Sequence, residues 1–126
     1  AELECKSIPD QAPTLVRWFG NEASQERDVC ASWLNDVNPM AYKSAYTAFA
    51  KSSLPSRGSL ARLQCPALFM TGSSEPNSTP AMSEAMADIA PDGRAIVVEG
   101  AAHMMPMTHP REVNAALAAL VEEVSK

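Results

Sequence analysis

The pattern of apolar and polar positions predicts helices in the first half of the chain. In the segment ERDVCASWLNDV, residues 26–37, apolar side chains recur at the three-and-four spacing of one helix face, namely at Val29, Cys30, Trp33, Leu34 and Val37. Asn38 and Pro39 are typical of an N-cap and a first helical position. They predict a second helix whose apolar face is Tyr42, Ala45, Tyr46, Phe49 and Ala50. A shorter helix is expected to hold Leu15, Val16 and Phe19 and to stop at Gly20.

The second half of the chain alternates between strand and helix signals. PALFMTG (66–72) and RAIVVEG (94–100) are short apolar runs that end in Gly, typical of strands buried on both faces. Thr79 and Pro80 predict the start of a helix with a buried stripe of Met82, Ala85, Met86 and Ile89. Pro110 opens a last helix with apolar positions at Val113, Ala116, Leu117, Leu120, Val121 and Val124. This β-α-β-α order predicts parallel strands.

The composition narrows the class of protein. The 126 residues, 46% hydrophobic and 20% charged, are typical of one globular domain, and the net charge of −5 without a basic stripe argues against a nucleic-acid partner. We find no run long enough to span a membrane and no signal peptide. Cys5, Cys30 and Cys65 lack metal-ligand or disulfide spacing. We therefore expect a cytoplasmic protein without a metal or another cofactor.

The ends of the two predicted strands carry the candidate chemistry. Glu75 lies four residues after Thr71, which ends the first strand, and His103 lies four residues after Glu99, which ends the second. Parallel strands deliver their following loops to the same edge of a sheet. A carboxylate and an imidazole are therefore expected to meet there, as a base and its orienting acid must. The small residues 100–102 allow the loop before His103 to turn tightly.

The stretch from Leu60 to Val121 resembles the C-terminal end of an α/β-hydrolase. It combines the pattern G-x-x-acid-x-N-x-x-P, from Gly72 to Pro80, with G-x-x-H-x-x-P, from Gly100 to Pro106. The Ser, Pro and Gly content of KSSLPSRGS (51–59) indicates a connector between two regions. The resemblance implies that these regions form a partial α/β-hydrolase fold. Residues 1–60 would form a helical cap, and residues 61–126 the β-α-β-α C-terminal part of the core.

The resemblance also implies catalytic roles. In this family the nucleophile precedes the acid and the histidine, so Glu75, where Asp is usual, and His103 take the last two places. The chain has no G-x-S-x-G nucleophile elbow. We therefore expect a missing N-terminal half, or another chain, to complete the sheet and to supply a Ser, Cys or Asp nucleophile. The expected substrate is a small apolar ester or related carbonyl compound, and C–C hydrolysis is an alternative reaction. The predicted lining of the substrate site is Met104, Met105, Trp18 and Phe19.

Other interpretations of these residues stay open. A histidine in a loop is often a hydrogen-bonded structural residue, and a glutamate in a Gly/Ser/Pro loop is often a solvated turn residue. His109 before Pro110 is expected only to start a helix, and Trp33, Tyr42 and Tyr46 are expected to be packing residues. The alternative function is a non-catalytic interaction or regulatory module derived from a hydrolase, whose free strand edge binds a partner.

Overall fold

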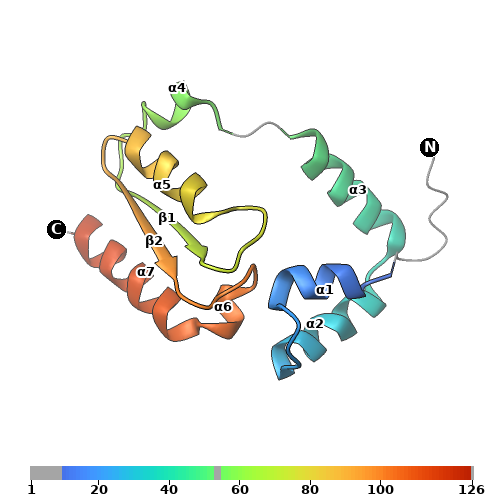
Figure 1. Ribbon diagram of the computed structural model, residues 1–126. Helices are drawn as coiled ribbons and strands as arrows, with labels where there is room; N and C mark the ends of the chain where they lie inside the picture. Colours follow the sequence, from blue (N-terminus) through green and yellow to red (C-terminus); the bar gives the residue numbers. More distant parts are fainter. Residues whose placement is uncertain (1–9, 53–54, 126) are drawn as a thin grey trace.

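The computed structural model describes residues 10–52 and 55–125 and contains seven helices and two strands there (Figure 1). Cys5, one of the three cysteines considered above, lies outside the described residues. In chain order the elements are α1 (Ala12–Phe19), α2 (Gln25–Asp36), α3 (Pro39–Lys51), α4 (Arg57–Leu60), β1 (Ala67–Gly72), α5 (Pro80–Ile89), β2 (Gly93–Val98), α6 (Met105–Thr108) and α7 (Pro110–Val124).

The two strands pair in parallel, as predicted from the β-α-β-α order, and the structure adds a short helix, α6, before the last one. Ala67 lies opposite Gly93, and the register continues without a bulge to Gly72 opposite Val98. Helices α5 and α7 lie on opposite sides of the strand pair (Figure 1). Both strands therefore end side by side, and the loops that follow them leave from one edge. The described part of the chain is thus an α/β structure with a two-stranded sheet.

The helix starts follow the local sequence signals. The Asn38 side chain accepts hydrogen bonds from the backbone N–H groups of Met40 and Ala41, and Pro39 occupies the first helical position. The predicted stop of α1 is also present, because Gly20 has a φ of 82°. The connector 51–59 is not wholly irregular, since α4 begins within it at Arg57.

The buried face of α5 is not the predicted one. Ser83, Ala87 and Ala90 are buried, whereas Met82 is 37% exposed and Ala85 is exposed. The helix packs against both strands through these small residues, so a Cβ added to Gly93 would lie 2.2 Å from the Ala87 carbonyl oxygen. The predicted stripe is wrong for Met82 and Ala85, because close approach of helix and strand favours the smallest side chains, whereas its other members Met86 and Ile89 are half-buried.

Several predicted packing residues are exposed. Trp33 and Tyr46 are 60% and 55% exposed, so the packing prediction is wrong for both, whereas Tyr42 packs against the core. The strands are also less buried than predicted, because Ile96 and Val97 are each more than a third exposed. Within the described ranges, the other large apolar side chains on the surface are Val16, Met40, Phe49, Leu117, Val121 and Val124. Apolar faces of α3, β2 and α7 therefore face outward.

A small core joins the N-terminal helices to the loop after β2. Leu15, Cys30 and Leu34 are buried together, and the side chains packed against them include Trp18, Phe19, Met104 and Met107. The Cys30 thiol lies 3.7 Å from the Met107 sulfur, and burial raises the pKa of this thiol. We call these three buried residues the cap core, a name taken from the helical cap that the sequence resemblance implies. It fixes α1 and α2 against the segment that follows His103.

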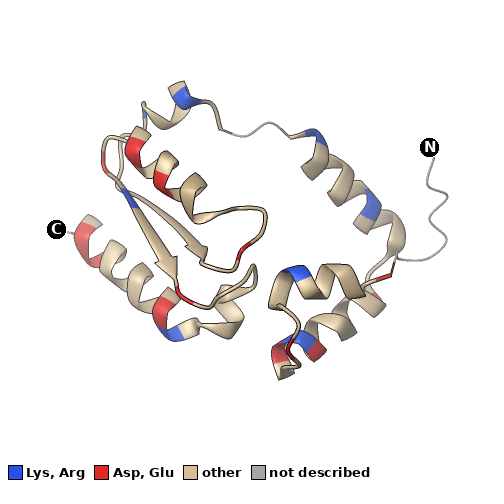
Figure 2. Ribbon diagram, in the orientation of Figure 1, with Lys and Arg blue, Asp and Glu red and all other residues tan. Residues whose placement is uncertain are grey.

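Charged side chains are interspersed along the described elements (Figure 2). Arg94 on β2 forms an ion pair with Glu123 on α7, which ties the last helix to the sheet.

No helix among the described residues is both long enough and apolar enough to cross a membrane.

Candidate active site

Backbone hydrogen bonds hold the two loops that leave the sheet edge against each other. The Ser73 N–H donates to the Val98 carbonyl at 3.0 Å, and the Ser74 N–H donates to the Ala101 carbonyl at 2.9 Å. The Ser73 hydroxyl in turn accepts from the Gly100 N–H at 2.9 Å. The loop before Glu75 and the loop before His103 are therefore a continuation of the parallel strand pair.

Two glycines allow this close approach. Gly100 has a φ of 73°, a left-handed conformation that residues with a side chain rarely adopt. A Cβ added to Gly72 would lie 2.0 Å from the Ala101 carbonyl oxygen. Ala101 itself is fully buried. The predicted tight turn is confirmed, and its geometry depends on the absence of a side chain at position 72 as well as at position 100.

Substituting Gly72 by alanine is expected to destabilise the protein by about 1–3 kcal/mol, the typical cost of overpacking a well-packed site. The added methyl group meets backbone atoms of Ala101, which cannot move without breaking the Ser74 hydrogen bond. Urea unfolding measures this loss. The matched control is Gly58→Ala on α4, where the nearest atom is the flexible end of Arg62, 3.3 Å away. Equal stabilities of the two variants would contradict the prediction.

Glu75 and His103 meet at the sheet edge, as predicted, but the predicted equal offsets are wrong. The strands end at the paired residues Gly72 and Val98, so the acid lies three residues and the histidine five residues beyond its strand. The imidazole Nδ1 lies 2.6 Å from a carboxylate oxygen of Glu75. The Glu75 side chain is only 3% exposed, whereas that of His103 is 47% exposed. The pair therefore has a buried acid and an accessible base. Whether it takes part in catalysis stays a prediction.

The surroundings of Glu75 favour its ionised form. Burial by itself raises the pKa of this carboxyl group, but the backbone N–H of Asn77, the His103 ring and the backbone N–H of Ser78 all act in the opposite direction. The net result is a pKa below the ordinary value of 4.5. The N–H groups of Asn77 and Ser78 both donate to the oxygen that His103 does not contact. Glu75 is therefore a carboxylate at neutral pH with both oxygens engaged.

An ionised Glu75 determines which nitrogen of His103 carries the proton. A carboxylate only accepts hydrogen bonds, so the imidazole Nδ1 must donate. In the neutral ring, Nε2 then has a free lone pair. Across residues 10–52 and 55–125, Nε2 has no hydrogen-bond partner. The arrangement can therefore accept a proton at Nε2 while Glu75 stabilises the imidazolium that forms.

The sequence also predicted Trp18, Met104 and Met105 as site residues and His109 as a helix start. Trp18 stacks on the imidazole of His103, with ring centroids 6.3 Å apart and an interplanar angle of 20°. Met104 packs against the cap core and does not belong to the pocket described below, and Met105 begins α6, half-buried. His109 is the N-cap residue of α7, as expected, and its Nδ1 lies 2.8 Å from the Thr108 hydroxyl.

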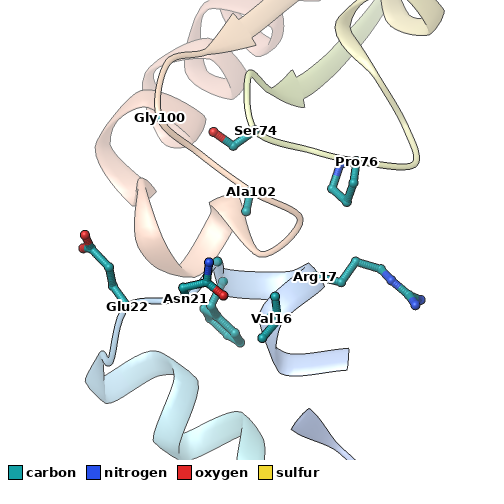
Figure 3. A pocket seen from close by; sticks show the side chains of 10 residues that line it. Val16, Arg17, Asn21, Glu22, Ser74, Pro76, Gly100 and Ala102 are labelled. Carbon is teal, nitrogen blue, oxygen red and sulfur yellow. The ribbon is translucent and has the colours of Figure 1, made fainter. Parts of the chain in front are cut away.

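A pocket of about 330 Å³ lies between the end of α1 and the two loops (Figure 3). It is lined by Val16, Arg17, Phe19, Gly20, Asn21, Glu22, Ser74, Pro76, Gly100 and Ala102. Glu75 and His103 are not among these residues, but their immediate chain neighbours Ser74, Pro76 and Ala102 are. The pocket therefore adjoins the acid–histidine pair from the side of the N-terminal helices.

Sequence reasoning missed the polar residues of this pocket. Of the four substrate-binding residues predicted from the sequence, Phe19 alone lines the pocket. Arg17, Asn21 and Glu22 also line it and were not predicted. The Trp18–His103 stack had no sequence signal, since 84 intervening residues separate the partners.

Comparisons with known proteins connect the chain to one curated hydrolase. The chain is 40% identical over 110 residues to (E)-2-((N-methylformamido)methylene)succinate hydrolase of Acinetobacter baylyi. The match covers 86% of this chain but 42% of that protein, so the chain spans less than half of the relative's length. No protein-family model matches the chain, and no solved structure matches it significantly.

Proposed function

We propose that this chain is the acid- and histidine-bearing part of an α/β-hydrolase that cleaves a carbonyl substrate with carboxylate groups. The observation that carries the proposal is the 2.6 Å contact between His103 Nδ1 and a buried, ionised Glu75. This arrangement leaves Nε2 as an accessible base beside a pocket. The similarity to a curated hydrolase and the order of acid before histidine both support it.

The nucleophile is proposed to come from the part of the polypeptide that this chain does not contain. A serine hydroxyl or cysteine thiol would attack the carbonyl carbon and pass its proton to His103 Nε2. Glu75 would stabilise the imidazolium, which then protonates the leaving group. Water would release the acyl group by the same route in reverse. Donors for the developing oxyanion would also belong to the rest of the protein.

The outer surface of the sheet also supports the proposal that a further part of the polypeptide packs against this chain. Two strands by themselves make a marginal sheet, and β2 exposes Ile96 and Val97. On α7, Leu117, Val121 and Val124 are about half exposed and lie at helical spacing along one side. We propose that the rest of the polypeptide adds strands to this sheet and covers these apolar side chains. The relative is long enough to contain such a portion, because the chain spans 42% of it.

The proposed substrate class follows from the relative's name and from the pocket. The named substrate is a succinate, hence a dicarboxylate, that bears an N-methylformamido-methylene group. Arg17 is the cationic residue among the pocket-lining side chains, and its side chain extends outward on the Pro76 side (Figure 3). A guanidinium pairs well with a carboxylate through two parallel hydrogen bonds. Glu22 lines the opposite part of the pocket, so the second carboxylate of the substrate is proposed to lie away from it.

The experiment that tests the proposal is a hydrolysis assay on the full-length polypeptide that contains this chain. p-Nitrophenyl acetate and butyrate test the apolar esters that the sequence suggested, and an N-acyl aminomethylene-succinate tests the dicarboxylate class. Hydrolysis of the dicarboxylate with the higher kcat/KM is expected. Faster hydrolysis of the apolar esters would overturn the substrate class. Inactivity toward both classes would favour the non-catalytic module.

Substituting Arg17 by alanine is expected to raise KM for the dicarboxylate about 10- to 100-fold, the typical effect of losing hydrogen bonds to a charged group. The kcat should change little, because no hydrogen bond or ion pair within the described residues joins Arg17 to Glu75 or His103. Steady-state kinetics measure both constants. Arg57→Ala on α4, an exposed arginine remote from the pocket, is the matched control. An unchanged KM in Arg17→Ala would remove Arg17 from the substrate site.

A further inference from the structure

Trp18 connects helix α1 to the loop of His103 through two separate contacts. Its carbonyl oxygen accepts a hydrogen bond of 3.0 Å from the backbone N–H of Met104. Its indole ring stacks on the imidazole of His103, with centroids 6.3 Å apart and planes 20° from parallel. The two contacts therefore hold the backbone beside the histidine and the histidine ring itself. Both come from one residue of the N-terminal helices.

The imidazole needs a second restraint. Glu75 binds only Nδ1, and His103 is 47% exposed, so a single hydrogen bond holds an otherwise accessible ring. Rotation about that bond would move Nε2 away from the position where a reacting group sits. A stacked aromatic ring limits this rotation, and the centroid distance lies within the range in which aromatic pairs attract, about 4.5–7 Å.

We propose that Trp18 is a positioning residue that keeps the His103 ring oriented with Nδ1 on Glu75 and Nε2 open to the reacting groups. This inference rests on the proposed function of the Glu75–His103 pair. The contact acts on the orientation of the imidazole, because the two ring planes lie within 20° of parallel.

Trp18 also packs against the cap core, so its substitution has a structural effect that must be separated from positioning. Trp18→Phe keeps an aromatic ring at this place, whereas Trp18→Leu removes the stack and keeps apolar bulk. Leu34→Ala is the matched control, because Leu34 is buried in the same cap core on α2 and is not stacked on His103. It reproduces a loss of packing without touching the ring.

The test uses the full-length protein and two readouts. Nitrogen-15 NMR of the histidine side chains, without substrate, reports the proton on His103 Nδ1 and its exchange with water. Kinetics with the best substrate separate kcat from KM. In Trp18→Leu we expect faster exchange of that proton and a kcat reduced about 10- to 100-fold, as for a misplaced catalytic group. Trp18→Phe should keep most of both properties, and Leu34→Ala should keep the NMR signal.

Three results would overturn the proposal. The first is an unchanged His103 signal in Trp18→Leu. The second is a change confined to KM, which would make Trp18 a substrate contact instead. The third is the same loss of signal in Leu34→Ala, which would show a packing effect only. Because the NMR readout needs no turnover, it tests the role of Trp18 even if hydrolysis by the full-length protein is not found.

Discussion

Replacing His103 by alanine is expected to lower kcat of the full-length protein about 10⁴-fold or more, the scale seen when a base that acts together with a nucleophile is removed. The imidazole is the group whose Nε2 is accessible and whose other nitrogen is held by an acid. Without it, the nucleophile has no base and the leaving group no acid. KM should change little, because substrate binding is proposed for the adjoining pocket.

The matched control for this variant is His109→Ala. His109 lies six residues further along the chain, at the N-cap of α7, and its ring contacts Thr108 rather than a carboxylate. It should retain nearly full activity at every pH tested. Thermal unfolding of both variants separates misfolding from loss of chemistry. Wild-type activity in a folded His103→Ala protein would refute the role of His103.

Replacing Glu75 by glutamine is expected to lower kcat about 10³- to 10⁴-fold, because it places the proton on the wrong nitrogen of His103. One oxygen of Glu75 accepts the N–H groups of Asn77 and Ser78, so the amide oxygen must take that place. The amide NH₂ then faces Nδ1, which has to accept rather than donate. The ring proton moves to Nε2, and the base is blocked.

The pH dependence of kcat/KM and the histidine NMR signals check this explanation. In Glu75→Gln the proton on Nδ1 should disappear, and activity should stay low across the whole pH range. Glu84→Gln, a substitution of an exposed glutamate on α5, is the matched control and should behave like the wild type. Activity of Glu75→Gln within a few fold of the wild type would mean that Glu75 does not orient the histidine.

Local sequence signals predicted the elements because each depends on neighbours in the chain. Asn38 with Pro39 started α3, and Gly20 ended α1. Short apolar runs ending in glycine gave two strands, and the helix between them required a parallel arrangement. The same geometry brought Glu75 and His103 together, since parallel strands release both following loops at one edge, although the two loops differ in length.

Helix faces were predicted less well, because burial depends on what lies beside a helix. On α5 the small side chains Ser83 and Ala87 face the strands, although Met82 and Met86 have the greater apolar surface. No neighbouring element covers three aromatic side chains of the N-terminal helices within the described residues, so these side chains are exposed: Trp33, Tyr46 and Phe49. Apolar periodicity identifies a stripe, but the partner that covers the stripe is decided by packing over long sequence distances.

The sequence by itself determined the order of elements, the parallel strand pair and the edge at which acid and histidine meet, because these follow from local propensity and strand polarity. Only the tertiary structure decided that the Glu75 oxygens divide between His103 and backbone N–H groups, which side chains form the pocket, and that Trp18 stacks on the imidazole. Those contacts join segments far apart in the chain, and their geometry depends on close packing that no local pattern encodes.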